Sequence, residues 1–169
     1  GHVVAAGDLK INADEVKLVA GSVRSEATLS IAGQSLENTG QVIAKQVALN
    51  SAQIDNKNLV YAQENLKIDA ANSVKNSGTM QAKKAIDIKS KAIENTGHVV
   101  AAGDLKLNAE AVKLVTGSVR SEATLSISGQ KLENAGQIIA KQVALNSAEL
   151  DNKNLVYAQE NLAIASANS

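Results

Sequence analysis

The stretch Leu36–Asn50, LENTGQVIAKQVALN, contains the pattern that decides the fold of this chain. An apolar residue and an acid precede Asn, a small residue and Gly, and the alternating apolar pairs V-x-A and V-x-L follow. The same pattern returns as LENAGQIIAKQVALN at Leu132–Asn146, and a degenerate copy, IENTGHVVAAGDLKLN, begins at Ile93. The chain is therefore built from copies of one unit.

Two repeat lengths organise these copies. Residues 1–73 align without gaps to residues 97–169, and 60 of the 73 pairs are identical. A shorter period of 18 to 20 residues is marked by Gly1, Gly21, Gly40, Asn58, Gly78, Gly97, Gly117, Gly136 and Asn154. Periods near 20 residues are typical of solenoids. We expect a single repeat segment, 1–169, with coils near 1–20, 21–39, 40–57, 58–77, 78–96, 97–116, 117–135, 136–153 and 154–169.

Apolar residues alternate at period two inside every coil. Small apolar residues stand two and four positions after each marker. A second pair follows eight and ten positions on, or seven and nine in the shortest coils, and a third apolar position comes near the coil's end. In the third coil these are Val42/Ala44, Val47/Leu49 and Ile54. Such alternation indicates strands with one side buried. Three short strands per coil predict an all-β parallel β-helix of about nine coils. A helical repeat is disfavoured, because no helix-period stripe persists and Gly or Asn interrupts each coil.

Composition supports a thin core and excludes several partners. The chain has no Phe, Trp, Pro or Cys and only two Tyr, so small and branched aliphatics must fill the interior. Its 17 basic and 17 acidic residues give no basic field for nucleic acid. No apolar run approaches the ~20 residues of a membrane span. The lack of Cys fits a cytosolic or a secreted protein equally. Since the chain opens mid-pattern without Met, we expect it to be a piece of a longer protein.

Asn and Gly are expected to stack at one corner. Two residues before a marker stand Asn38, Asn56, Asn76, Asn95, Asn134 and Asn152, whereas Val19 and Val115 occupy the equivalent place in two coils. Stacked amides satisfy backbone groups and bond along a stack, so a structural corner ladder is favoured over a binding ladder. The corner glycines, including Gly40, Gly78, Gly97 and Gly136, are expected to have positive φ, which Asn58 and Asn154 would tolerate.

A third column points to surface contact. Positions three beyond each marker must face outward because Arg24, Gln81 and Arg120 occupy them. The same column holds apolar and aromatic residues: Val4, Ile43, Tyr61, Val100, Ile139 and Tyr157. Either these residues are there because they favour strands, or they form a contact stripe against a second rod, a neighbouring segment or a receptor, with the tyrosines as anchors.

The L-x-N-x-G-x-I/V-x-A…L-x-L units resemble the haemagglutinin repeats of filamentous haemagglutinin and of contact-dependent growth inhibition proteins. The resemblance covers all nine coils. It implies a right-handed β-helical filament that is exported through an outer-membrane two-partner secretion transporter and lies on the surface of a Gram-negative cell. It also implies a role as an adhesin, with a target-cell receptor as partner, or as a stalk for a receptor-binding region and a toxin.

Nothing in the sequence predicts catalysis or a cofactor. His2 and His98 lie five coils apart, too far to share a metal, and are expected in solvent. The stacked acids Glu37/Asp55 and Glu133/Asp151 could be bridged by calcium, but the glycine-aspartate repeat of such sites is absent. Carbohydrate-active β-helix enzymes build walled sites from long inserted loops, and the coils here vary only from 18 to 20 residues. We therefore expect a non-enzymatic stalk segment, with a directly adhesive surface as the alternative and an enzyme as a remote one.

Overall fold

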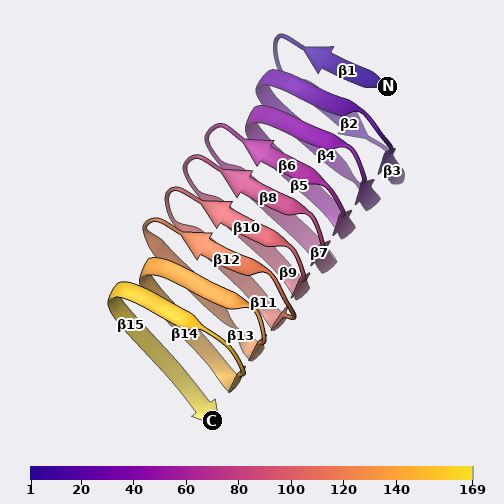
Figure 1. Cartoon of the computed structure of the whole chain (residues 1–169). Coiled ribbons are helices and arrows are strands. Elements are labelled where there is room, and N and C mark those ends of the chain that lie inside the picture. The colour runs from indigo at the N-terminus through magenta and orange to yellow at the C-terminus, as the bar shows by residue number, and fades with distance from the viewer. Residues whose placement is uncertain (169) are drawn as a thin grey trace.

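The computed structural model describes residues 1–168 and is a parallel β-solenoid of about nine turns. No helix is present in this range. Figure 1 shows the coils as one elongated stack with the two termini at opposite ends. This confirms the predicted all-β parallel fold. Ser169, the last residue of the ninth predicted coil, lies outside the described residues.

Within residues 1–168, fifteen strands form a single sheet that winds around the stack. Several strands bend through a corner and continue, so that in coils four to seven the second and third predicted segments join into one strand of 10 or 11 residues. The strands are β1 (His2–Ala5), β2 (Leu9–Asn12), β3 (Glu15–Leu18), β4 (Ser22–Asn38), β5 (Gln41–Asn56), β6 (Leu59–Ala62), β7 (Leu66–Asn76), β8 (Thr79–Ala82), β9 (Ile86–Asn95), β10 (His98–Ala101), β11 (Leu105–Leu114), β12 (Ser118–Ser121), β13 (Thr124–Asn134), β14 (Gln137–Asn152) and β15 (Val156–Asn168).

Each coil pairs in parallel with the next, and the register aligns equivalent residues of the repeat. On what we call the first face, β1 pairs with the start of β4, and the order continues through β5, β6, β8, β10, β12, β14 and β15. Leu66 aligns with Ile86, which aligns with Leu105 and then Leu125 on the second face. Side chains therefore stack in columns along the rod.

The interior is a column of aliphatic side chains without aromatics. The first predicted pair of each coil is inside, as for Val42 and Ala44, which are 0% and 1% exposed. The second pair and the third inward position are buried equally, as for Leu29, Ile31 and Leu36. Burial weakens toward the ends, where Val3, Leu162 and Ile164 are about half exposed. Each interior side chain is therefore covered mainly by the coils above and below it.

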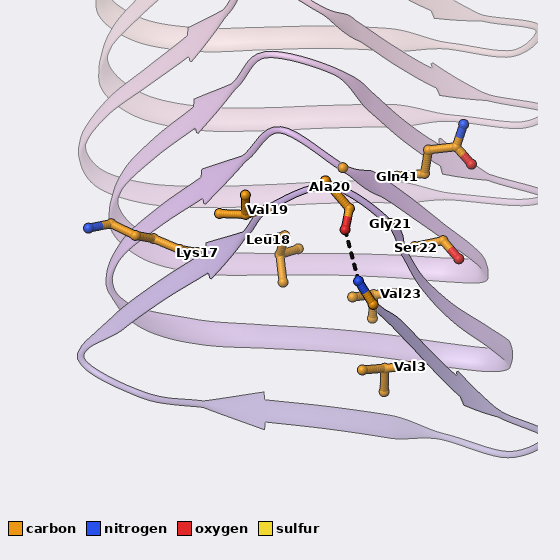
Figure 2. Close-up of a pocket in the computed structure, with 11 residues that line it drawn as sticks. Val3, Lys17, Leu18, Val19, Ala20, Gly21, Ser22, Val23 and Gln41 are labelled. Atoms are coloured by element: carbon orange, nitrogen blue, oxygen red, sulfur yellow. Dashed lines mark hydrogen bonds between the residues drawn. The ribbon is translucent and has the colours of Figure 1, made fainter.

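The N-terminal end of the interior is open. Figure 2 shows a hollow there, lined by residues that include Val3, Leu18 and Val23. The terminal ammonium of Gly1 donates a hydrogen bond of 3.1 Å to the carbonyl of Ala20 across this hollow. The hollow is the end of the aliphatic column and lacks the second coil that covers such side chains elsewhere.

The corner glycines are required mainly for close approach rather than for positive φ. Within residues 1–168, positive φ occurs at Ala20, Gly21 and Gly117. The expectation of positive φ at Gly40, Gly78, Gly97 and Gly136, and at Asn58 and Asn154, was therefore wrong. A Cβ at Gly97 would lie 2.0 Å from the carbonyl oxygen of Gly78 one coil below. At Gly78 and Gly97 the adjacent coil leaves no room for a Cβ, whereas Asn58 and Asn154 carry side chains at the marker of their own coils.

Replacing Leu125 by Asp is expected to unfold the protein. Leu125 is fully buried between Leu105 and Val143 in its column, so the carboxylate would lose its hydration without gaining a partner. Truncating such a leucine to Ala alone costs about 2–5 kcal/mol, and the charge adds to that. Ser126→Asp is the matched control, because Ser126 faces outward beside Lys106. Thermal unfolding followed by circular dichroism should show the control melting near wild type. A Leu125→Asp variant that also melted near wild type would contradict the register.

Candidate functional site

Asn side chains form a hydrogen-bonded ladder along the corner that precedes the first face. Five of the six are buried, and Asn152 in the penultimate coil is exposed. In four steps Nδ2 donates to Oδ1 of the next coil: 2.7 Å from Asn38 to Asn56, 2.8 Å from Asn56 to Asn76, 2.7 Å from Asn76 to Asn95, and 2.7 Å from Asn134 to Asn152. The amides also donate to backbone carbonyls, as Asn76 does to His98 at 3.1 Å. The five buried amides lie inside the rod, so they are not available to an external ligand.

The ladder is interrupted by leucine, and the expectation that Val19 and Val115 occupy its missing places was wrong. Leu18 pairs with Asn38, and Leu114 pairs with both Asn95 and Asn134. Val19 is 68% exposed at the corner. Counting back from the marker misplaced these residues because the two corners contain one additional residue. Counting forward from the inward residues Val16 and Val112 would have found Leu18 and Leu114.

Corner length explains where Asn is present. Where the ladder residue is Asn, two residues connect it to the strand of the first face, as Thr39 and Gly40 do after Asn38. Three residues make this connection after Leu114. In the short corner the amide bonds the corner backbone: Gly40 N–H donates to Asn38 Oδ1 at 3.2 Å, and Asn95 Nδ2 donates to the Gly97 carbonyl at 2.9 Å. The longer corners instead contain the positive φ of Gly21 and Gly117. Where the marker is Asn58 or Asn154, its Nδ2 donates to the corner carbonyl of the previous coil at 2.9 Å.

The stacked acids are neutralised by lysines of the chain. Lys57 Nζ lies 2.6 Å from a carboxylate oxygen of Glu37 and 3.3 Å from one of Asp55. The hydrogen bond from Lys57 lowers the pKa of Glu37. The hydrogen bonds that Lys57 donates to Glu37 and Asp55 raise its own pKa, and the bond to Glu37 has the larger effect. In the second copy, Lys131 pairs with Glu133 at 2.8 Å and Lys153 with Asp151 at 2.6 Å. Across residues 1–168, no group of three His, Cys, Asp or Glu side chains could hold a metal ion.

The histidines lie in two equivalent surface hollows produced by the duplication. His2 Nδ1 is 2.9 Å from Ser22 Oγ, and His98 Nδ1 is 2.9 Å from Ser118 Oγ. Eight positions line both hollows at an offset of 96 residues: His2/His98, Ala20/Thr116, Gly21/Gly117, Ser22/Ser118, Thr39/Ala135, Gly40/Gly136, Gln41/Gln137 and Asn58/Asn154. Neither hollow has an acid in its lining. The duplication has therefore reproduced a surface as well as a fold.

The suggested contact stripe lies on the first face, which we take as the candidate functional site. The register puts the nine residues in one column, in the order Val4, Arg24, Ile43, Tyr61, Gln81, Val100, Arg120, Ile139 and Tyr157. Arg24 and Arg120 are exposed, Tyr157 is 52% exposed, and Ile43, Tyr61, Val100 and Ile139 are half-buried by their column neighbours. A contact role for this column stays a prediction.

This face differs in chemistry from the rest of the rod. A second outward column runs beside the first: His2, Ser22, Gln41, Leu59, Thr79, His98, Ser118, Gln137 and Leu155. Among these two columns, all of them described, Arg24 and Arg120 are the only formally charged residues. The second face, by contrast, stacks Lys67, Asp87 and Lys106 in direct succession. Enrichment in Arg and Tyr with depletion of Lys, Asp and Glu is typical of protein interfaces.

Comparison with known proteins agrees with the geometry. The haemagglutinin repeat family model matches residues 1–59, 42–109 and 100–169. The chain belongs to the haemagglutinin repeat family. It is thus a repeat segment of the filamentous adhesin type. No curated protein and no solved structure gives a significant match.

Replacing Leu114 by Asn should be tolerated, because the new amide would connect the two halves of the ladder. Asn134 Oδ1 is buried and has no hydrogen-bond partner. The Nδ2 of the introduced amide would reach it, while the introduced Oδ1 accepts from Asn95. We expect the free energy of unfolding to change by less than about 1 kcal/mol, since the bonds gained offset the lost apolar burial. Leu107→Asn in the same coil is the control, and it should cost more than about 3 kcal/mol because its amide gains no partner. Equal losses in urea unfolding would show that the ladder does not govern this corner.

Proposed function

We propose that this chain is a stalk segment of a large secreted bacterial surface protein and that it extends a binding or toxin region away from the cell. The parent would be an adhesin or a contact-dependent growth inhibition protein, exported by an outer-membrane two-partner secretion transporter of a Gram-negative cell. Family membership supports the surface context. A stalk requires length and a uniform cross-section.

The uninterrupted register is the observation that carries the proposal. From His2 to Tyr157 every coil contributes one strand to the first face, and the coils vary only from 18 to 20 residues between markers. Each coil adds a rise of about 4.8 Å, so length is proportional to the number of repeats. Within residues 1–168, no loop is inserted that would wall off a pocket. This uniformity favours a spacer over the remote alternative of a carbohydrate-active enzyme. The stacked carboxylates of Glu37 and Asp55 are paired with Lys57, which makes them unsuited to act as a catalytic carboxylate pair.

No helix among the described residues is long and apolar enough to cross a membrane. The described surface also lacks the strongly basic face that would suit nucleic acid, since the 17 cations are mixed with 17 anions and several form ion pairs such as Lys84–Glu64 at 3.3 Å.

A stalk should accept whole extra repeats. Residues 1–96 placed before Gly1 would continue the pattern, because residue 97 resumes the sequence of residue 1. We expect the longer chain to fold with unchanged cooperativity and its maximum dimension in small-angle X-ray scattering to grow by five coils, or about 24 Å. Residues 1–86 placed at the same point are the control, since they end inside a coil and should disrupt stacking at the junction. A longer chain that gained width instead of length would contradict the proposal.

Direct adhesion is the second candidate function, and the chemistry of the first face is what supports it. The test is a variant in which four outward residues of the stripe are replaced: Ile43→Lys, Tyr61→Ser, Ile139→Lys and Tyr157→Ser. Because these side chains face outward, the melting temperature of the variant should stay within a few degrees of wild type. If the segment is adhesive, binding to target cells should fall at least tenfold. Equal binding by wild type and variant would leave the stalk role alone.

A further inference from the structure

We infer that the first face is a self-complementary interface through which two copies of this chain pack antiparallel, face to face. The interface consists of the two outward columns defined above, and the partner is a second copy of the same rod. This inference goes beyond the stalk role, because it concerns how rods associate rather than how far one rod reaches. It depends on the order of residues along the first face.

A two-fold axis parallel to the strands fixes how the columns would meet. Such an axis keeps strand direction and reverses the direction of the rod, so each column faces itself in reverse order. Strands of the two faces then stay aligned, which is the common geometry for packed sheets, with about 10 Å between them. An interface of this isologous kind closes on itself and gives a dimer rather than a fibre.

One register matches the column to its own reverse. If the second coil of one rod faces the ninth coil of the other, each Arg faces a Tyr, each Ile faces an Ile, and Gln81 faces Val100. The unique pairs, with the second residue in the other copy, are Arg24 with Tyr157, Ile43 with Ile139, Tyr61 with Arg120, and Gln81 with Val100. Guanidinium over a tyrosine ring is a favourable cation–π pair. The neighbouring column pairs Gln41 with Gln137 and Thr79 with His98 in the same register.

Registers in which the second coil faces the eighth or the seventh coil are worse, which gives the arrangement specificity in that direction. A shift of one coil one way puts both arginines against isoleucines, which leaves each guanidinium without an acceptor or a ring. A shift of two coils the same way puts Arg24 against Arg120 of the other copy, and like charges repel. The duplication creates this property, because the order Arg, Ile, Tyr occurs twice at an offset of 96 residues. The fifth coil, with Gln81, separates the two copies of the set.

The overlapped area implies a weak dimer. Eight facing coils span about 38 Å and four strand residues about 13 Å, so each rod would cover roughly 500 Å² and the pair about 1,000 Å² in total. That is the low end for a specific protein interface. Association should therefore depend on concentration, and on a cell surface it would be favoured wherever rods stand close together.

Cysteine cross-linking tests the register directly, because the chain has no native Cys. Two single variants, Ile43→Cys and Ile139→Cys, are mixed and oxidised with copper phenanthroline, and the products are separated without reductant. The pairing predicts a disulfide-linked dimer in the mixture, with at least tenfold less from either variant alone. The reason is that position 43 of one copy lies five coils from position 43 of the other in the dimer. Ala48→Cys mixed with Ala144→Cys is the matched control, because these residues belong to the same two coils on the second face.

The outcomes are distinct. Cross-linking only in the Ile43/Ile139 mixture, and loss of that product when Tyr61→Ser and Tyr157→Ser are added, supports the interface. Efficient cross-linking by Ile43→Cys alone overturns the register, because it would mean that coil three faces coil three. Equal cross-linking in the second-face control, or a wild-type chain that sediments as a monomer at millimolar concentration, overturns the dimer. End-to-end stacking would give open-ended species without the selective disulfide, and binding to cells by a monomer would assign the face to a receptor; either result overturns the inference. None of these results bears on rod length, so the stalk proposal is tested separately.

Discussion

Parallel hydrogen bonding between successive coils is the constraint on which this structure depends. One coil of about 19 residues has too few aliphatic side chains to enclose a core by itself. Stacking at ladder spacing supplies the missing contacts, because each interior residue is covered by its equivalents above and below. Leu105, Leu125 and Val143 show this arrangement in the middle of the rod, where each is almost fully buried. Leu162 and Ile164 show its absence near the C-terminal end, where the same kinds of side chain are half exposed.

The ladder spacing also decides which residues are tolerated at the corners. Cβ atoms at Gly78 or Gly97 would fall about 2 Å from a carbonyl oxygen of the adjacent coil, so these glycines follow from how close the coils lie. The buried Asn column uses the same spacing in the opposite way, since amides one coil apart are at hydrogen-bonding distance. Close stacking therefore excludes a Cβ at markers such as Gly78 and Gly97 and connects the amides that stand two residues before them.

The fold was predictable from the sequence because period-two alternation and the Gly or Asn markers recur in every coil. The outward column from Val4 to Tyr157 was also placed by that pattern, since strand alternation leaves no other side for Arg24 and Arg120.

The details of the corners were harder to predict from the sequence. Val19 and Val115 were misplaced because a corner of three residues and one of two look alike when counted from the marker, and both neighbours are apolar. The glycine role was misjudged because a clash between coils is a distance in space, which the sequence of one coil does not contain. The ion pair of Lys57 with Glu37 and Asp55 depends on a corner side chain that lies outside the strand columns.

Distances between spin labels along one outward column test the central claim, that each repeat adds one coil and one fixed rise. Lys10, Lys106 and Ala163 belong to one column of the second face. Labels at cysteines replacing Lys10 and Lys106 should lie about 24 Å apart, and labels replacing Lys10 and Ala163 about 38 Å apart, in proportion to five and eight coils. Pulsed electron paramagnetic resonance on dilute, doubly labelled chains measures both. Two narrow distributions in that ratio are the expected result, whereas distances that do not grow with coil number would contradict the solenoid and its register.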